Sequence, residues 1–290
     1  METLLRYFLS FFMGLILISC SKNHDDLSVA QRRELSKEMY QEEVSKHGFD
    51  GPFQGTPIGM TLLDDILALD STNCEALRAY SVPYLKRGIP HKWKRWFDKA
   101  VECDPKMWQP WRGYLYLWFY RDYKRAIDDF NASDTLTPNF IDSPQGHSVD
   151  YWRGIAYLGL KDYTNSIRYF DTHIATVTKD SGEDWVEPSA FLYLGIVHFE
   201  NSNLEKANLN IDKALQYYQN VSADSHYYKA LLQARNKAHA EALISVNKAI
   251  ENYNQGYYSK RDYVEEIRQI YPQQLESLRN AISDSISRNK

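Results

Sequence analysis

The sequence predicts an all-α protein, a solenoid of helical hairpins stacked along the chain. Two similar stretches, residues 66–77 and 100–111, begin 34 residues apart and place Asp70 and Asp104 at the same position. Apolar residues recur at the three- and four-residue spacing of a helix face, and Gly or Pro interrupts that spacing between helices. A period of this length is typical of repeat proteins, in which neighbouring units bury a shared core.

Residues 1–19 predict a signal peptide. An apolar run over residues 7–18 follows a single Arg and is too short to span a membrane as a helix. The ending "LISC" resembles the bacterial lipobox, which implies that the leader is removed and that Cys20 is lipidated, with residues 20–27 as the lipidated start and tether. An ordinary signal peptide and an uncleaved anchor remain as alternatives.

The lipobox resemblance implies a lipid-anchored protein of the bacterial cell envelope. Acyl chains contribute about 0.8 kcal/mol per buried CH2, so lipid on Cys20 would hold the mature chain at a membrane. Ser21 follows the cysteine where an Asp would signal retention in the inner membrane, and the outer membrane is therefore the expected address.

Residues 28–73 predict a degenerate first hairpin that caps the solenoid. Ser28 and Gln31 have the spacing of a capping box, and the helix that they open is expected to run to His47. A second helix, expected over residues 60–70, supplies apolar side chains to the next hairpin.

Residues 74–105 predict the first full hairpin. A turn at residues 88–90 separates two helices, and Pro105 stops the second because proline cannot continue a helix. The apolar positions on one face are Leu77, Tyr80 and Tyr84 in the first helix, and Trp93, Phe97 and Ala100 in the second.

This hairpin resembles the tetratricopeptide repeat, a 34-residue pair of helices. The resemblance extends over residues 74–251, with a weaker fifth unit around Val246, and Arg153 and His173 depart from the pattern. Small residues let neighbouring helices approach, and large ones fill the gap. Residues in register include Trp111, Tyr114, Ala126 and Phe130 in the second unit, Gly154, Tyr157, Ser166 and Phe170 in the third, and Phe191, Gly195, Ala207 and Ile211 in the fourth.

The resemblance implies a right-handed superhelical solenoid that binds a protein or peptide. The first helix of each unit lines the concave face of such a solenoid, and an open groove there suits an extended peptide with a few anchors. The alternative is that terminal helices fill the superhelix and make this stripe part of the core. The predicted groove residues are Arg78, Val82, Leu85, Arg112, Tyr116, Phe119, Ile155, Leu192, Ile196 and Phe199.

Two connections, residues 139–150 and 178–188, are longer than the repeat requires. Both join a second helix to the next first helix, so we expect them at one edge of the solenoid, where insertions often carry binding sites. Tolerated surface insertions are the alternative. The candidates at this loop edge are Gln145, His147, Asp184 and Trp185.

Residues 252–290 predict capping helices at the carboxyl end. Leu275, Leu278 and Ile282 form an apolar stripe on a charged helix that follows Pro272. A terminal helix with a polar outer face is what a stacked array needs where it meets water.

Cys74 and Cys103 are the cysteines that remain if Cys20 is lipidated. The predicted hairpin brings them to the same end, and an oxidising compartment would permit a bond between them. We expect two buried free thiols, with a disulfide as the alternative. No Cys or His spacing indicates a metal site.

The sequence carries no catalytic signature, since GxSxG, HExxH, GxxxxGK[ST] and GxGxxG are all absent, and we expect no enzyme and no cofactor. The Asp pairs at 64–65 and 128–129 are expected on polar helix faces as solvated carboxylates. His173 and His198 are expected to be core histidines with satisfied hydrogen bonds.

A formal net charge of -4 gives no basic footprint, so nucleic acid is not an expected partner. The sequence therefore predicts a membrane-anchored, extracytoplasmic scaffold or adaptor that binds proteins in the bacterial envelope. The alternative is a lipoprotein that binds a small ligand or glycan fragment through stacked Tyr and Trp rings. The sequence makes no prediction of oligomeric state.

Overall fold

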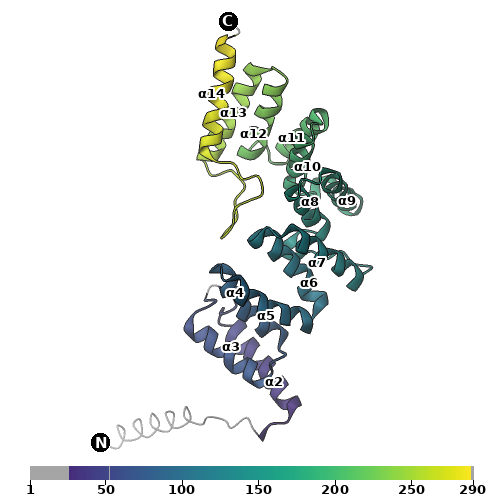
Figure 1. The fold of residues 1–290 in the computed structure, drawn as a ribbon, viewed down its shortest axis with the longest axis vertical. Coiled ribbons are helices and arrows are strands. Elements are labelled where there is room, and N and C mark those ends of the chain that lie inside the picture. The colour runs from purple at the N-terminus through teal and green to yellow at the C-terminus, as the bar shows by residue number, and fades with distance from the viewer. Residues whose placement is uncertain (1–25, 52, 289–290) are drawn as a thin grey trace, which may run out of the picture. The chain divides into compact units, whose positions relative to one another are not determined.

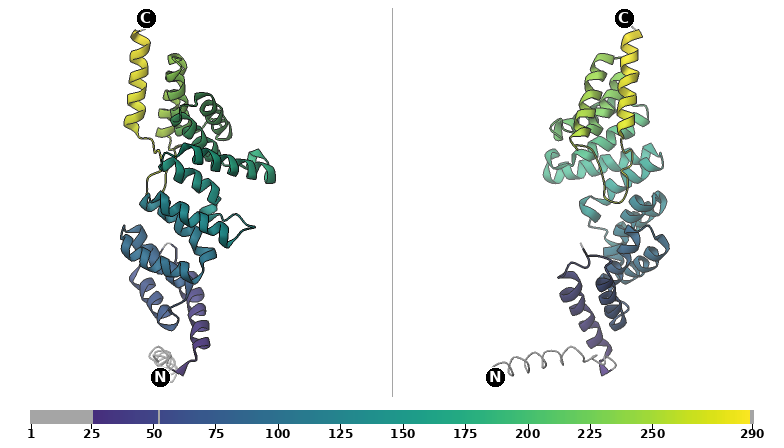
Figure 2. Two further views of the ribbon diagram at one scale, coloured as in Figure 1. Left: turned by 45° about the vertical axis from the view of Figure 1, so that its right-hand side comes forward. Right: turned by 90° about the vertical axis from the view of Figure 1, so that its left-hand side faces the viewer.

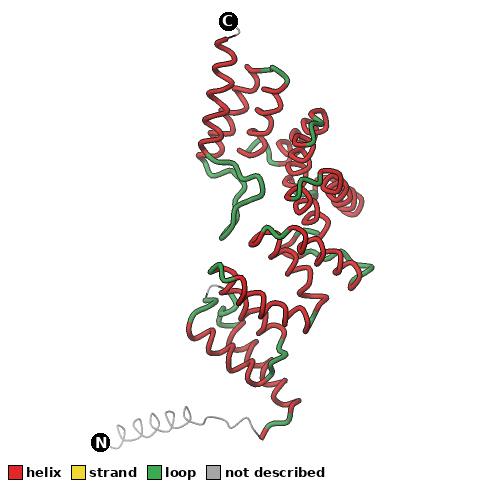
Figure 3. The backbone as a smooth tube through the Cα atoms, in the orientation of Figure 1, coloured by secondary structure: helices red, strands yellow, loops and turns green. Residues whose placement is uncertain are grey.

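The computed structural model describes residues 26–51 and 53–288, and every regular element among them is helical (Figure 1, Figure 3). The all-α class is therefore confirmed for these residues. The predicted signal peptide and Cys20 lie outside them. No helix in the described part of the chain is long and apolar enough to cross a membrane. The chain divides into two compact units: unit 1 is residues 1–103 and unit 2 is residues 104–290.

Unit 1 is built from two helical hairpins. The predicted capping box is confirmed: the Ser28 hydroxyl accepts a hydrogen bond from the Gln31 N–H, and the Gln31 side chain accepts one from the Ser28 N–H at 3.0 Å. The first helix continues as a π-helix. The elements are α2 (Val29–Met39), η2 (Tyr40–Ser45), α3 (Pro57–Leu69), α4 (Cys74–Lys86) and α5 (Pro90–Cys103).

The core of unit 1 joins its two hairpins. Asn73 caps α4 by accepting from the Ala76 N–H at 3.0 Å, and its amide donates to the buried hydroxyl of Ser36 at 2.9 Å. Ser36 in turn donates to the carbonyl of Ile66 at 3.1 Å, so these buried polar groups are paired. The surrounding apolar cluster is Tyr40, Val44, Leu63, Ile66, Ala76 and Ala79.

A disulfide bond joins Cys74 and Cys103, so the expectation of two buried free thiols is wrong. Cys74 begins α4 and Cys103 ends α5, and their Cα atoms are 5.6 Å apart, a separation that a disulfide spans. Both residues are only partly buried. The bond closes the open end of the hairpin across a sequence separation of 29 residues.

Unit 2 is a row of hairpins that confirms the predicted solenoid of tetratricopeptide-like pairs. Each second helix packs on its own partner and, within the row, on the first helix of the next hairpin. The hairpins are α6 (Pro105–Leu115) with its π-helical extension η3 (Tyr116–Tyr120) and α7 (Tyr123–Leu136); α8 (Val149–Gly159) and α9 (Tyr163–Ser181); α10 (Pro188–Glu200) and α11 (Leu204–Tyr217); and α12 (Ala223–Arg235) and α13 (His239–Asn254).

Close approach within each pair explains the small residues of the first helices. A Cβ added to Gly113 would lie 2.7 Å from the Phe130 ring, and one added to Gly154 would lie 2.9 Å from the Phe170 ring. Both phenyl rings are fully buried and fill the space that the absent side chain leaves. The alternation of small and large residues is thus a steric requirement of the stack.

The prediction of capping helices across residues 252–290 is wrong for residues 255–271. The chain leaves α13 after Asn254 and forms no helix until α14 (Pro272–Arg288). We call this segment the arm. Gly256, near its start, has a left-handed backbone with φ of 87°, which favours glycine. Figure 2 shows the arm turning back along unit 2 before α14 returns.

The helix that follows the arm has the predicted apolar stripe. Leu275 joins a buried cluster with Ala249 of α13, and Ile282 joins another with Val246. α14 therefore caps the last hairpin through apolar packing.

Candidate functional site

The first helices of unit 2 share a face that contacts the arm, and we call this the inner face. It comprises Tyr114 from α6, Trp118 from η3, Trp152 from α8, and Tyr193 and Glu200 from α10. The two tryptophan rings meet edge to face with centroids 5.9 Å apart, and Tyr114 meets Trp152 in the same way at 5.2 Å. Successive hairpins thus present a continuous aromatic surface with one carboxylate.

Arg261 of the arm lies on this aromatic surface. Its guanidinium carbon is 3.7 Å from the centroid of the Trp118 ring and 5.4 Å from that of Trp152. Its Nη1 donates a hydrogen bond to the Tyr114 hydroxyl at 2.9 Å. A cation over an indole face is attracted by the ring quadrupole, and more strongly where water is excluded. The arginine is therefore held by stacking and by a directed hydrogen bond together.

Glu266 is the second anchor of the arm. Its Oε1 lies 3.0 Å from Arg261 Nε, and its Oε2 accepts a hydrogen bond from the Tyr193 hydroxyl at 2.9 Å. Burial, with the nearby carboxylate of Glu266, raises the pKa of Tyr193 well above its usual value, so this hydroxyl stays protonated and can donate.

Arg268 is the third anchor. Its Nε and Nη2 lie 2.5 and 2.8 Å from the two carboxylate oxygens of Glu200, a bidentate arrangement. Nη2 also lies 3.5 Å from the carbonyl oxygen of Leu158 in α8. The hydrogen bonds that Arg268 donates to Glu200 raise the pKa of Arg268 despite its partial burial. Arg268 therefore joins the arm to two successive hairpins.

The base of the arm is fixed to the start of α12. The Ala223 N–H donates to the Tyr257 carbonyl at 2.8 Å, and the Ser259 N–H donates to Asp224 Oδ2 at the same distance. Burial raises the pKa of Asp224 to about 6, although hydrogen bonds from Ser259 act in the opposite sense. A cavity of about 340 Å³ lies here, lined by Tyr218, Val221, Ser222, Asp224 and residues 256–259.

The structure places several predicted groove residues in the interior, which corrects the expectation of an open stripe. Phe119 is half-buried, and Arg78, Val82 and Leu85 lie on α4 of unit 1, where Leu85 is buried and the other two are half-buried. The first helices of unit 2 are packed within the hairpin row and beneath the arm. The buried residues are Tyr116, Ile155, Leu192, Ile196 and Phe199.

Arg112 forms a bidentate ion pair with Asp129, with Nε–Oδ2 and Nη2–Oδ1 distances of 2.8 and 2.7 Å. Asp129 is buried and also accepts from the Gln109 amide at 2.9 Å. The expectation that the Asp pair at 128–129 is solvated is therefore wrong for Asp129. The polar face of α7 at this position meets α6 instead of water.

The loop-edge candidates divide into two kinds. Gln145, Asp184 and Trp185 are exposed, and the Trp185 side chain is 75% exposed. His147 instead pairs with Glu187: its Nδ1 lies 2.7 Å from Glu187 Oε1. The contact between His147 and Glu187 thus joins the two long connections to each other.

His173 also contacts Glu187. We call the contacts among His147, Glu187, His173 and Ser148 the polar relay. The Nε2 of His173 lies 2.9 Å from Glu187 Oε2, and its Nδ1 lies 2.8 Å from the hydroxyl of Ser148, which caps α8. Burial would raise the pKa of Glu187, but hydrogen bonds from His147 and His173 outweigh burial and lower it to about 2. The prediction of a satisfied core histidine is confirmed for His173 and is wrong for His198, which is buried but whose Nδ1 has no hydrogen-bond partner among the described residues.

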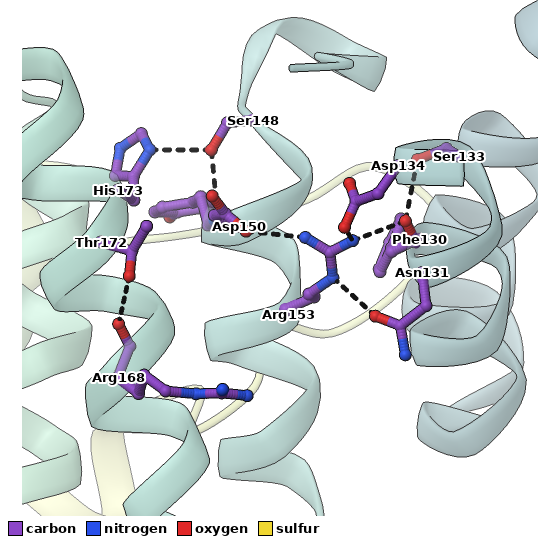
Figure 4. A network of polar contacts seen from close by, with 11 residues as sticks. Phe130, Asn131, Ser133, Asp134, Ser148, Asp150, Arg153, Arg168, Thr172 and His173 are labelled. Atoms are coloured by element: carbon purple, nitrogen blue, oxygen red, sulfur yellow. Dashed lines mark hydrogen bonds and ion pairs between the residues drawn. The ribbon is translucent and has the colours of Figure 1, made fainter. Parts of the chain in front are cut away.

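The contacts of Arg153 account for its departure from the repeat pattern (Figure 4). This arginine is 2% exposed, and its guanidinium donates to Asp150 at 2.7 Å, to Asn131 at 3.1 Å and to the Phe130 carbonyl at 2.6 Å, with an ion pair to Asp134. It therefore connects α8 to α7 with its charge fully paired.

Sequence reasoning missed the arm and its three anchors. A usable signal was present, because Gly256 and Pro272 bracket a stretch that lacks a helical apolar period. Nothing in the sequence indicated that Arg261 would find Trp118, since the two residues are far apart along the chain. The described residues contain no group of His, Cys, Asp and Glu arranged to hold a metal ion.

Comparison with known proteins agrees with this architecture. Residues 192–257, which include most of α10 and all of α11 to α13, match the family model described as Tetratricopeptide repeat. No curated protein sequence matches the chain.

Three solved structures are similar in fold. A tetratricopeptide repeat protein from Parabacteroides merdae is 14% identical with a TM-score of 0.51, over 97% of this chain and 98% of that one. Pseudomonas aeruginosa pilF is 15% identical with a TM-score of 0.55, over 78% and 94%. PilW, described as a type IV pilus biogenesis factor, is 15% identical with a TM-score of 0.51, over 78% and 91%. At these identities the likeness concerns the fold alone.

Proposed function

We propose that the protein is a membrane-anchored scaffold that binds other proteins in the bacterial envelope. The observation that carries the proposal is that the inner face holds a non-helical stretch of polypeptide, the arm, through Arg261 and Arg268. Stacking and bidentate pairing are general means of binding an extended segment, and repeat solenoids present such surfaces to their partners.

The envelope address depends on Cys20, and the Cys74–Cys103 bond supports it because disulfides persist mainly outside the cytosol. Cells that express the protein should incorporate labelled palmitate into it and retain it with outer membranes. The Cys20→Ala chain should lose both properties. Label that persists in the Cys20→Ala chain would contradict lipidation at this residue.

Site-specific photo-cross-linking tests the scaffold role. A photoreactive residue in place of Tyr263, which is 65% exposed in the arm, should give discrete protein adducts in intact envelopes. The matched control places the same residue at Phe53, 57% exposed in unit 1. If neither position yields protein adducts, or if both yield the same diffuse set, the scaffold role is contradicted.

A second function, the binding of a small ligand or glycan fragment, is favoured by the exposure of Trp185 at the loop edge. An aromatic ring with one open face can stack on an apolar ligand surface. Retention on a glycan array that is lost in Trp185→Ala and kept in Ile244→Ala, a 60% exposed control, would support this function. If the array retains no glycan, this second function is contradicted.

A further inference from the structure

We propose that the arm is a built-in occupant of a peptide-binding face, which a partner protein displaces with an extended segment of similar chemistry. That segment carries an Arg, a Glu five residues later and a second Arg two residues after the Glu, the spacing of Arg261, Glu266 and Arg268. This inference rests on the scaffold role and specifies the partner for the same face.

The inner face selects side chains by their chemistry. Trp118 and Trp152 receive a guanidinium, Glu200 pairs with a second one in bidentate fashion, and the Tyr193 hydroxyl donates to a carboxylate. None of these contacts requires that the bound segment belong to the same chain. A partner segment with charges at the same spacing would make all of them.

The arm adopts backbone conformations that a separate segment need not adopt. Tyr263 and Arg268 have φ of 68° and 65°, in the left-handed region that is disfavoured for residues with a Cβ. Both turns lie in a segment whose two ends are joined to α13 and α14. A partner segment enters from solvent without this constraint, so it can match the anchors with less strain.

The arm can leave without the loss of α14. Leu275 and Ile282 pack with buried residues of α13, and Ile270 at the end of the arm belongs to the first of these clusters. The three anchors, by contrast, make mainly polar and stacking contacts, and Asp262 and Tyr263 between them are exposed. Tyr258, at the base of the arm, also packs on the first cluster, so exchange of residues 260–268 leaves the apolar cap in place.

Binding of a synthetic peptide to the full chain tests the proposal. The probe is a fluorescent peptide that keeps the anchors Arg261, Glu266 and Arg268 at their spacing, together with Ile267, which is buried in the docked arm, and has Ser or Gly at the other arm positions. We expect wild type to bind it weakly, because a tethered competitor acts at an effective concentration in the millimolar range. The Arg261→Ala/Arg268→Ala chain should bind the probe at least about tenfold more tightly, since its own competitor is weakened.

Matched controls separate the anchors from general effects. Asp262→Ala alters an exposed residue of the same arm and should bind the probe as wild type does. A probe with Gln at both Arg positions should not bind. Glu200→Gln, introduced into the doubly substituted chain, should weaken the probe about tenfold, because the bidentate partner is lost.

A second measurement applies even if the doubly substituted chain fails to fold. In wild type, millimolar probe should speed amide hydrogen exchange across residues 260–268 and leave α13 unchanged. Equal affinity of wild type and the doubly substituted chain, equal binding of the Gln probe, or no change in exchange would overturn the proposal. Dimers formed by the doubly substituted chain on addition of wild type would also overturn it, since a second copy's arm would then be the occupant.

The outcomes distinguish the two proposals. Intact peptide exchange without cross-linked envelope proteins would contradict the scaffold role. Cross-linked partners without peptide exchange would contradict only the role of the arm.

Discussion

Unit 1 and unit 2 secure their stacked hairpins by different means. Unit 1 has two hairpins and a covalent bond between Cys74 and Cys103, whereas the sequence of unit 2 contains no cysteine and its inner face is contacted by the arm. A short stack buries little shared interior, so a cross-link adds much to its stability. A longer stack buries more shared interior, so it depends less on a cross-link. It can hold part of its own chain by exchangeable contacts.

The largest effect should come from removing the disulfide. Replacing Cys74 and Cys103 by Ala should lower the stability of unit 1 by about 3–4 kcal/mol, the chain-entropy value for a loop of about 30 residues. Hydrogen exchange of α4 and α5 should accelerate, while unit 2 should keep its protection. Equal acceleration in both units would remove the contrast between them.

The next effect concerns the polar relay of unit 2. Glu187→Gln should cost about 2–3 kcal/mol at neutral pH, because the pKa of Glu187 is about 2 in the folded protein against 4.5 for an ordinary Glu. A lowered folded pKa means that this stability is present above about pH 4.5 and is lost as the pH falls towards 2. Denaturant melts of wild type and variant across this range measure it.

Glu183→Gln is the matched control for the relay. Glu183 lies in the same connection, and hydrogen bonds from Lys213 and Tyr217 lower its pKa, but its side chain is 38% exposed. Solvent screens such a pair, so the loss should be well below that of Glu187→Gln. Equal losses would show that burial of Glu187 is unimportant.

A smaller effect is expected in the arm. Arg261→Ala should weaken arm docking by about 2 kcal/mol, the value for a desolvated cation–π contact. Amide exchange should rise in residues 260–268 and remain unchanged in α6 and α8. Asp262→Ala should leave exchange as in wild type, and a general loss of protection in unit 2 after Arg261→Ala would mean that the arm is part of the core.

The smallest effect should come from Asp224 at the base of the arm. Burial raises its pKa to about 6, so the folded state holds a proton more tightly than the unfolded state and stability falls as the pH rises from about 4 to 6. Asp224→Asn removes this dependence and should be about 1 kcal/mol more stable than wild type at pH 7, after the weaker hydrogen bond to Ser259 is counted. The measured quantity is the stability of Asp224→Asn minus that of wild type. A smaller difference at pH 7 than at pH 5 would contradict the prediction.

Much of the fold could be predicted because its signals are local. The capping box at Ser28, the stop at Pro105 and the small residue at Gly154 each act within one helix or one hairpin. The candidate site was predicted less well. Ile155 and Leu192 were placed on the correct helices, but helical spacing cannot tell an open face from one that another segment covers.

The amino-acid sequence by itself determined the hairpins, their order and their spacing, because helix periodicity, caps and steric pairing are properties of neighbouring residues. The tertiary structure decided which side chains met across long stretches of chain: Cys74 with Cys103, Arg112 with Asp129, and Arg261 with Trp118. The physical reason is that the sequence around a charged side chain or a thiol does not indicate which residue will be its partner. Its partner is set by which helices pack side by side, and by where the chain returns after the last hairpin.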